Sequence, residues 1–254
     1  MSLLKVENLS KAYGDFWVVN HVSFSLEQGQ VLALIGPNGA GKTSTFNMIG
    51  GQSSANAGHV WFKADAHAEP VDLIGLSSDA IWKLQIGRTF QIAEVFSSLT
   101  VVENVQLALQ VAHKTRLSWF NQSRYDLRQE ALALLADLAM LEVADRPASE
   151  IAYGNVKRLE LAMALANHPR LLLMDEPVAG MSPAERVAMM ALVKKIAQER
   201  QMAILFTEHS MDVVFAFADH IIVMAGGEII ASGIPDDIKE NPIVKAAYLG
   251  SVTI

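Results

Sequence analysis

The chain has 254 residues, of which 51% are hydrophobic, so it is long enough for one large domain or two closely joined subdomains. The net charge of −7, without a block rich in Lys and Arg, argues against nucleic acid as the main partner. The lack of cysteine excludes disulfides and thiolate metal sites. No apolar run approaches the roughly 20 residues of a membrane-spanning helix, and the N-terminal stretch does not have the pattern of a secretory signal.

The N-terminal part of the chain predicts a small antiparallel element. Residues 3–9 and 18–26 alternate between apolar and polar side chains, which is typical of strands, and a Gly-Asp pair at 14–15 provides a turn between them. The short apolar run 30–35 predicts a buried strand. It leads into a glycine-rich loop and then a helix at about 42–49.

The middle of the chain changes from loops to helices. Residues 50–58 are rich in Gly, Ser and Asn and predict a loop, and 60–62 predict the start of an edge strand. The polar stretch 65–80 predicts a loop with a short helix. From 99 to 168 the helical period dominates, and we expect this region to be a subdomain inserted into the sheet.

Two helices are predicted within that helical region. One covers 125–141, and the other covers 155–167 and ends at His168-Pro169. The first helix carries an apolar face, as an amphipathic helix against a core requires. The residues of that face are Leu127, Ala131, Leu134, Leu135 and Leu138.

The C-terminal third returns to short strands. Residues 171–174 predict a buried strand, and Ser182-Pro183-Ala184-Glu185 is a capping box that starts a helix ending near Arg200. Three more strands are predicted at 203–206, 221–224 and 228–231, with a glycine pair at 226–227 as the turn between the last two. Strands that alternate with helices indicate an α/β fold with a mainly parallel sheet.

The strongest motif is a phosphate-binding loop. Residues 36–43 read Gly-Pro-Asn-Gly-Ala-Gly-Lys-Thr, which fits G-x-x-x-x-G-K-[ST] between a predicted strand and a predicted helix. The glycines let backbone amides turn towards phosphate oxygens, and the helix N-terminus adds partial positive charge. Lys42 is expected to reach the β- and γ-phosphates, and Thr43 to bind Mg²⁺. The alternative is a glycine turn that binds nothing.

A pair of acids follows the buried strand at 171–174. Asp175 and Glu176 fit a Walker B segment, in which Asp175 holds the Mg²⁺ shell and Glu176 polarises the attacking water. The alternative interpretation is two carboxylates at a solvated strand end. The phosphate-binding loop at 36–43 in the same chain makes that alternative less favoured.

Three single residues are further candidates, each with an ordinary alternative. Gln91 could reach Mg²⁺ or the attacking water, or it could be a surface amide. His209, just past an apolar strand, could contact the γ-phosphate, or it could be a hydrogen-bonded core histidine. Tyr13 could stack on adenine, or it could be a packed aromatic side chain.

The order of these motifs resembles that of ABC-transporter ATP-binding subunits over nearly the whole chain. The resemblance favours the functional interpretation of Gln91 and His209. It implies a P-loop NTPase of ABC type, with one ATPase domain over 1–254. Residues 1–94 and 169–254 would form a RecA-like core that includes the antiparallel element, and 95–168 would form a helical insert carrying a signature segment.

Several short segments resemble the subunits of branched-chain amino-acid importers. They are Arg88-Thr89-Phe90-Gln91, Ala152-Tyr153-Gly154, Pro177-Val178-Ala179-Gly180-Met181, and Asn241-Pro242 with Ala247-Tyr248-Leu249-Gly250. The residues at 178–181 also resemble the corresponding segment in the ATP-binding subunits of urea importers. The sequence therefore does not identify the solute.

The chain departs from the usual family pattern at two places. Leu-Ser-Gly-Gly-Gln is the usual signature, whereas this chain has Ile151-Ala152-Tyr153-Gly154-Asn155. Without a hydroxyl, Ala152 cannot bond the γ-phosphate held by an opposite subunit, a loss of about 1 kcal/mol that backbone amides partly offset. Ser182 replaces the family's Asp and serves as a helix N-cap instead.

The resemblance implies ATP and Mg²⁺ as ligands, a second ATPase subunit in a head-to-tail dimer, and membrane permease subunits that keep the chain at the cytoplasmic face of the membrane. A periplasmic solute-binding protein is an indirect partner. Glu176 and His209 are the expected catalytic residues, and Thr43, Gln91 and Asp175 the metal ligands. The nucleotide contacts are expected from Tyr13, Gly36, Pro37, Asn38, Gly39, Ala40, Gly41, Lys42, Thr43, Ser44, Gln91, Ala152, Tyr153, Gly154 and Asn155.

Other classes are less consistent with the sequence. Soluble ABC ATPases of DNA repair or translation resemble chains with two cassettes or with long coiled-coil or zinc inserts. A P-loop kinase does not need the signature segment, and no Asn-Lys-x-Asp guanine reader of a GTPase is present. A binding-only cassette would not need both Glu176 and His209. A soluble ABC ATPase and a urea-type importer ATPase remain the alternatives.

Overall fold

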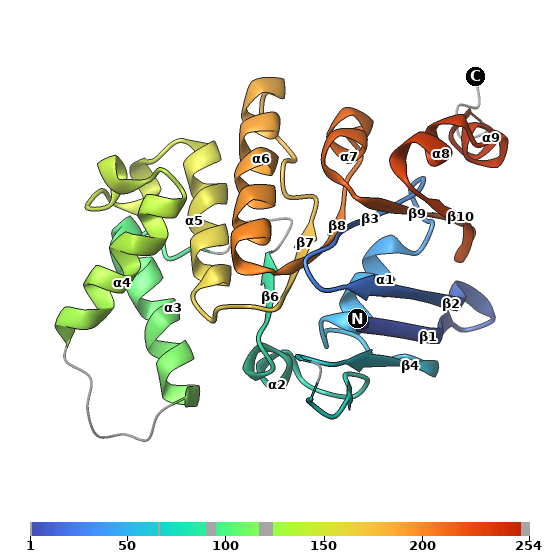
Figure 1. Cartoon of the computed structure of the whole chain (residues 1–254), viewed down its shortest axis with the longest axis horizontal. Helices are drawn as coiled ribbons and strands as arrows, with labels where there is room; N and C mark the ends of the chain where they lie inside the picture. Colours follow the sequence, from blue (N-terminus) through green and yellow to red (C-terminus); the bar gives the residue numbers. More distant parts are fainter. Residues whose placement is uncertain (1, 66, 90–94, 117–123, 250–254) are drawn as a thin grey trace.

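The computed structural model describes residues 2–65, 67–89, 95–116 and 124–249. Within these ranges the strands form two sheets (Figure 1). The larger sheet has the order β10-β9-β3-β8-β7-β6, and its strands are parallel except that β10 runs antiparallel to β9. Its members are β3 (Val31–Ile35), β6 (Ile86–Thr89), β7 (Leu171–Asp175), β8 (Ala203–Thr207), β9 (His220–Ala225) and β10 (Glu228–Gly233).

The smaller sheet is antiparallel, with the order β2-β1-β4-β5. It confirms the predicted N-terminal element. The strand predicted at 60–62 is not an edge strand, because β5, which the sequence did not indicate, pairs beside it. The four strands are β1 (Ser2–Tyr13), β2 (Phe16–Glu27), β4 (Ala57–Phe62) and β5 (Val71–Asp72).

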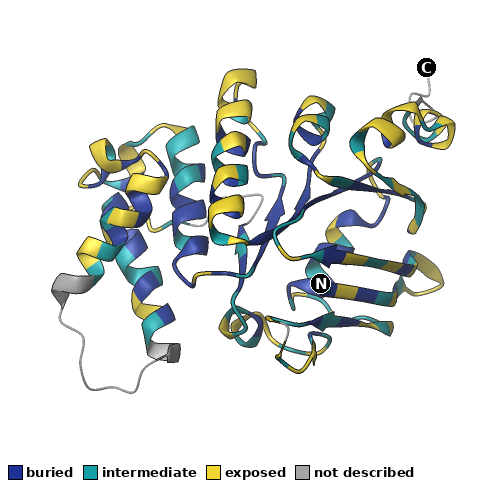
Figure 2. Ribbon diagram, in the orientation of Figure 1, coloured by how far each residue is buried: buried dark blue, intermediate teal, exposed yellow. Residues whose placement is uncertain are grey.

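The three central strands β3, β7 and β8 are buried at every position, because both faces of the parallel sheet are covered. Alternate side chains belong to two separate cores. Leu32 and Leu34 pack with α1 and the antiparallel sheet, whereas Val31, Ala33 and Ile35 pack with the helices of the opposite face. Figure 2 shows the resulting continuous band of buried residues through the middle of the molecule.

Helices cover both faces of the larger sheet. Three of them, α3, α4 and α5, pack on one another and stand together on the left of Figure 1, away from the antiparallel sheet. None of the helices in the described ranges has the length and apolar character needed to cross a lipid bilayer. The helices are α1 (Lys42–Ile49), α2 (Ser78–Lys83), α3 (Val101–Arg116), α4 (Arg124–Asp137), α5 (Tyr153–Leu165), α6 (Pro183–Arg200), α7 (Met211–Phe217), α8 (Pro235–Glu240) and α9 (Pro242–Leu249).

Most predicted elements are confirmed, and the boundaries differ where the backbone turns. The helix predicted at 125–141 is wrong at its C-terminal end, because Ala139 adopts φ +54° and a 3-10 turn follows at Leu141–Val143. The helix predicted at 155–167 begins earlier, at Tyr153. The capping box of α6 is complete, since the Ser182 hydroxyl accepts from the Glu185 amide and the Glu185 carboxylate accepts from the Ser182 amide.

Candidate functional site

The loop between β3 and α1 lies at the carboxyl end of the sheet's central strands, where α/β proteins bind ligands. Its backbone requires glycine at two points. A Cβ at Gly36 would stand 2.1 Å from the carbonyl oxygen of Met224, and one at Gly41 would stand 2.4 Å from that of Val18. Gly41 caps α1 with φ +98° and without a side-chain hydrogen bond, so the first amides of α1 are not satisfied by a capping side chain.

The ammonium group of Lys42 lies buried inside this loop. Its Nζ donates to the carbonyl oxygen of Gly36 at 2.7 Å and to that of Pro37 at 3.1 Å. Burial lowers the pKa of Lys42, and the nearby Glu176 and Asp175 carboxylates act in the opposite direction. The ammonium charge, together with the uncapped amides at the start of α1, is suited to bind an anion.

Two carboxylates reach the loop from the end of β7. Parallel pairing with β8 sets Asp175 opposite Thr207, and the Thr207 hydroxyl donates to Oδ1 of Asp175 at 2.6 Å. Asp175 is buried, whereas Glu176 is partly exposed and has φ +49°, a left-handed conformation that is costly for a side chain with a Cβ. The strained turn is held because the amide of Glu176 donates to the carbonyl oxygen of Thr207 at 3.2 Å.

The end of β8 contributes the opposite wall. Nε2 of His209 lies 2.9 Å from Oε1 of Glu176, so these side chains meet although they are far apart in sequence. Glu208 is buried and links the turn after β7 to the turn after β8. Its carboxylate accepts from the amide of Val178 at 3.1 Å and from that of His209 at 3.0 Å. Together these elements enclose a cleft of about 170 Å³ lined by Val18, Asn38, Gly39, Ala40, Gly41, Lys42, Thr43, Ser44, Glu176, Thr207 and His209.

Among the described residues, Tyr13 and the signature segment do not line this cleft. Tyr13, at the end of β1, is 61% exposed, and the Lys11 ammonium lies 5.3 Å from the centre of its ring. Gln91 falls outside the described residues. Of the signature segment, Ala152 is the N-cap of α5 and Tyr153 is largely exposed beside Gly180.

Sequence reasoning missed three residues of the site. Thr207 and Glu208 directly precede His209, so their position after an apolar strand was the available signal. Val18 offered no signal, because it reaches the loop only through the packing of β2. Val18 shapes the wall of the cleft, and Thr207 and Glu208 form hydrogen bonds that hold its turns.

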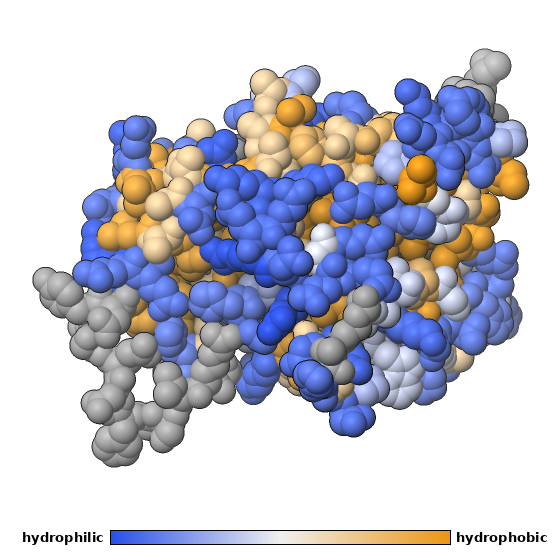
Figure 3. All heavy atoms as spheres, viewed as in Figure 1, coloured by the Kyte–Doolittle hydropathy of each residue, from blue (hydrophilic) through white to orange (hydrophobic). Residues whose placement is uncertain are grey.

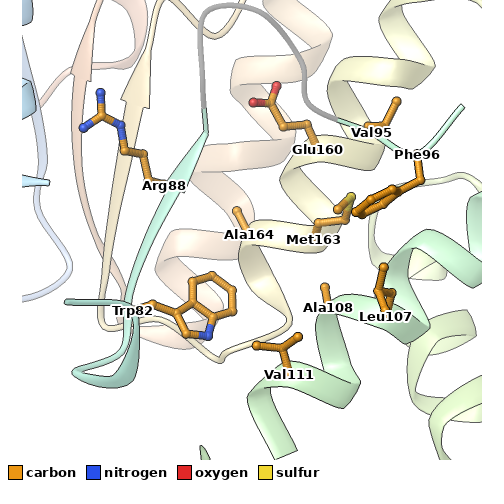
Figure 4. Close-up of a pocket in the computed structure, with 10 residues that line it drawn as sticks. All are labelled: Trp82, Arg88, Val95, Phe96, Leu107, Ala108, Val111, Glu160, Met163 and Ala164. Carbon is orange, nitrogen blue, oxygen red and sulfur yellow. The ribbon is translucent and has the colours of Figure 1, made fainter. Parts of the chain in front are cut away.

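A second, larger cleft of about 640 Å³ is lined by β6 and by residues of α2, α3 and α5 (Figure 4). Its walls are mostly apolar, with the charged side chains Arg88 and Glu160 both in the upper part of the view in Figure 4. The Arg88 guanidinium bonds the Asn47 side chain at 2.8 Å, and burial lowers its pKa. Lining residues are Trp82, Arg88, Val95, Phe96, Leu107, Ala108, Val111, Glu160, Met163 and Ala164.

A glycine loop around a buried lysine, with carboxylates from the adjacent strand end, defines a nucleotide-binding P-loop protein of the α/β class. A family model described as ABC transporter matches residues 19–179, and one described as branched-chain amino acid ATP-binding cassette transporter matches 228–252. The chain therefore belongs to the ABC transporter family and is an ABC-type ATPase, as its motif order predicted.

Similar proteins share the full extent of the chain. The high-affinity branched-chain amino acid transport ATP-binding protein BraF of Pseudomonas aeruginosa is 34% identical, and LivG of Escherichia coli K12 is 35% identical, each over 98% of both chains. The crystal structure of an ATP-binding cassette of an ABC transporter in its ADP conformation has a TM-score of 0.85 at 30% identity and covers 98% of this chain and 99% of that one. These likenesses confirm the predicted fold class.

Proposed function

We propose that the chain is the ATP-hydrolysing subunit of an ABC importer for branched-chain amino acids. The observation that carries the proposal is the contact between Glu176 and His209 over the phosphate-binding loop, at 2.9 Å. The relatives described as branched-chain amino acid transport ATP-binding proteins, together with the match of 228–252, support the solute class.

The residues around the loop fit a Mg-nucleotide. Asp175 supplies a carboxylate beneath the loop and Thr43 an exposed hydroxyl at the start of α1, and such oxygen donors suit Mg²⁺. We assign Gln91 as a third ligand on the resemblance alone. A bound Mg²⁺ would neutralise charge on the β- and γ-phosphates. Tyr13 stacks on the adenine in this proposal, with its exposed ring available for that contact.

Glu176 acts on the water that attacks the γ-phosphate. Its carboxylate is partly exposed beside the loop, which suits a group that must orient and deprotonate a water molecule. His209 orients that carboxylate through their shared contact and supports the γ-phosphate from the end of β8.

A second ATPase subunit completes each site. Tyr153 and Gly154 lie outside the cleft of their own chain, which suits a segment that contacts the nucleotide of a partner. The starts of α5 and α6 lie side by side, since Gly154 approaches the Glu185 carboxylate. Hydrophobic side chains gather over the upper end of α6 in Figure 3, and exposed Val187 belongs to that helix. We propose that this surface faces the partner in a head-to-tail dimer.

The apolar cleft of Figure 4 receives the permease. It lies between β6, which precedes residue 91, and the helices of the proposed insert 95–168, so a segment seated there touches both parts of the proposed single ATPase domain. Nucleotide-driven movement of the insert against the 1–94 and 169–254 core would then reach the membrane. This contact is what keeps the chain at the cytoplasmic face, with a periplasmic binding protein delivering the solute.

Replacing Glu176 with Gln tests the hydrolytic role. Glu176→Gln keeps the size of the side chain but removes the base, so we expect ATP binding within about twofold of wild type and turnover lowered by at least about 100-fold. Binding is measured on the isolated chain, and turnover on the transporter assembled with its permease and second ATPase subunit.

The matched control is Glu199→Gln, an exposed side chain in the last turn of α6, away from the start of that helix, and it should leave both quantities unchanged. Unchanged hydrolysis in Glu176→Gln would exclude Glu176 as the base. The solute is tested by titrating branched-chain amino acids and urea into the periplasmic binding protein of the same transporter. Binding of urea alone would reject the proposed class.

A further inference from the structure

The turn at residues 96–100 is closed by one side chain of α3. Asn104 is fully buried, and its carboxamide bonds the turn with both of its polar atoms. Its Oδ1 accepts from the amide of Phe96 at 2.8 Å. Its Nδ2 donates to the carbonyl oxygen of Phe96 at 3.1 Å and to that of Thr100 at 2.9 Å. A single residue therefore fixes the shape of this turn from inside the protein.

Phe96 carries the turn into the wall of the apolar cleft. Its ring lines the cleft, as Figure 4 shows, and the residue is 51% exposed. Aromatic side chains are enriched in the contacts between proteins, where a fixed orientation lowers the entropic cost of binding. Because Asn104 bonds both the amide and the carbonyl of Phe96, it determines the direction in which the ring leaves the backbone.

The same turn is joined through its backbone to the segment that precedes the signature. Residues 97–102 and 144–149 are connected by backbone hydrogen bonds, with an antiparallel bridge between Thr100 and Pro147. The donor and acceptor pairs are Val101 to Arg146, Val102 to Ala144, Ala148 to Leu99 and Ser149 to Ser97, at 2.9–3.2 Å. The signature segment 151–155 follows directly after the 3-10 turn at Ala148–Glu150. A displacement of the first segment therefore reaches the start of α5.

We propose that Asn104 is a positioning residue for the permease, which holds Phe96 in the wall of the apolar cleft and joins that wall to the signature segment. A permease segment that pushes on Phe96 moves the 96–100 turn, and the backbone bonds carry this movement to 151–155. The inference rests on the proposed function in one respect, namely that the permease occupies the apolar cleft.

The test replaces Asn104 with Ala, which removes the side-chain bonds to the turn. We expect affinity for the detergent-solubilised permease, measured by co-purification over a concentration series, to fall by at least about fivefold, because Phe96 is no longer held. The Kd for ATP of the isolated chain should stay within about twofold of wild type, since the phosphate-binding loop is unchanged. Hydrogen exchange of the isolated chain should become faster over 96–102 and 146–152 together, but not over 34–41.

Leu135→Ala in α4 is the control for a general loss of stability. Leu135 is equally buried in the same helical region and does not line the cleft. The cavity destabilises this region, yet permease binding should remain as in the wild type. If Asn104→Ala binds the permease no worse than Leu135→Ala does, or leaves exchange over 146–152 unchanged, the positioning role is overturned.

The wild-type chain supplies a second measurement, which decides the matter if Asn104→Ala does not fold. When the chain assembles with the permease without nucleotide, exchange should slow over 96–102 and 146–152 together. Protection limited to the first peptide would overturn the link to the signature segment. Phe96→Ala tests the proposed function separately, because wild-type permease binding by this variant would reject the cleft as the permease site itself.

Discussion

Thr207 is the side chain on which the geometry of the two carboxylates depends most directly. Its hydroxyl donates to Asp175 at 2.6 Å and accepts from the amide of Glu176 at 3.2 Å, so one oxygen holds both the buried acid and the strained backbone beside it. Because Asp175 is buried, a lost partner leaves its carboxylate poorly satisfied.

We expect Thr207→Val to lower the free energy of unfolding by about 1–3 kcal/mol, because it removes a buried donor at nearly constant volume. Urea denaturation of the isolated chain measures the change. Thr89→Val is the control, since its buried hydroxyl has no hydrogen-bond partner among the described residues, and we expect no loss there. Equal effects of the two substitutions would show that the Asp175 contact has no special weight.

At this scale the sequence predicted the chemistry of the site better than its contacts. The loop at 36–43 could be predicted because its residue order is specific for phosphate binding. The pairing of Glu176 with His209 could not, because it depends on the register of β7 against β8 and on the left-handed turn at Glu176. Neither the strand register nor the left-handed turn can be predicted from the spacing of residues along the sequence.

The start of α6 is the element whose sequence signal is strongest. Ser182 and Glu185 bond each other's amides, and Pro183 occupies the first turn, where its missing N–H has no cost. The Ser182 hydroxyl and amide together lower the pKa of Glu185. This cap places α6 beside Gly154 of the signature segment.

We expect Ser182→Ala to destabilise the protein by about 1 kcal/mol at neutral pH, because the N-cap hydroxyl is lost. Ser182→Asp keeps an acceptor at the cap and should retain most of the stability. Thermal and urea denaturation of the three proteins provide the comparison. A Ser182→Asp protein as unstable as Ser182→Ala would mean that capping does not explain the residue.

Elements without such local signals were predicted less well. Strand β6 is short and contains Gly87 and Arg88, so it is a strand because β7 pairs with it and not because of its own propensity. The helices α7, α8 and α9 have at most eight residues and were not predicted, since so few turns give little periodicity. The end of α4 depends on one left-handed residue, Ala139.

At the scale of the whole molecule, the proposed roles of the two clefts, ATP binding in the smaller and permease binding in the larger, can be tested separately. We expect Val111→Asp, at an exposed position of α3 in the larger cleft, to leave the ATP Kd of the isolated chain unchanged. The added charge opposes an apolar permease segment, so co-purification with the permease and transport should fall by at least about tenfold.

Leu141→Asp is the control, because Leu141 is similarly exposed but does not line that cleft. It should assemble as wild type does. Normal assembly and transport of Val111→Asp would place the permease contact elsewhere on the chain.

The neighbouring strands β6 and β7 are adjacent in the sheet although the whole helical region separates them along the chain. Their pairing closes a long loop, which costs conformational entropy before any contact rewards it. The helices between them pack mainly on one another, so a folded α3–α5 region would bring Thr89 and Leu171 closer together than a flexible chain of that length. From this topology we expect the helices to fold first and the edge of the sheet that carries β6 to form last.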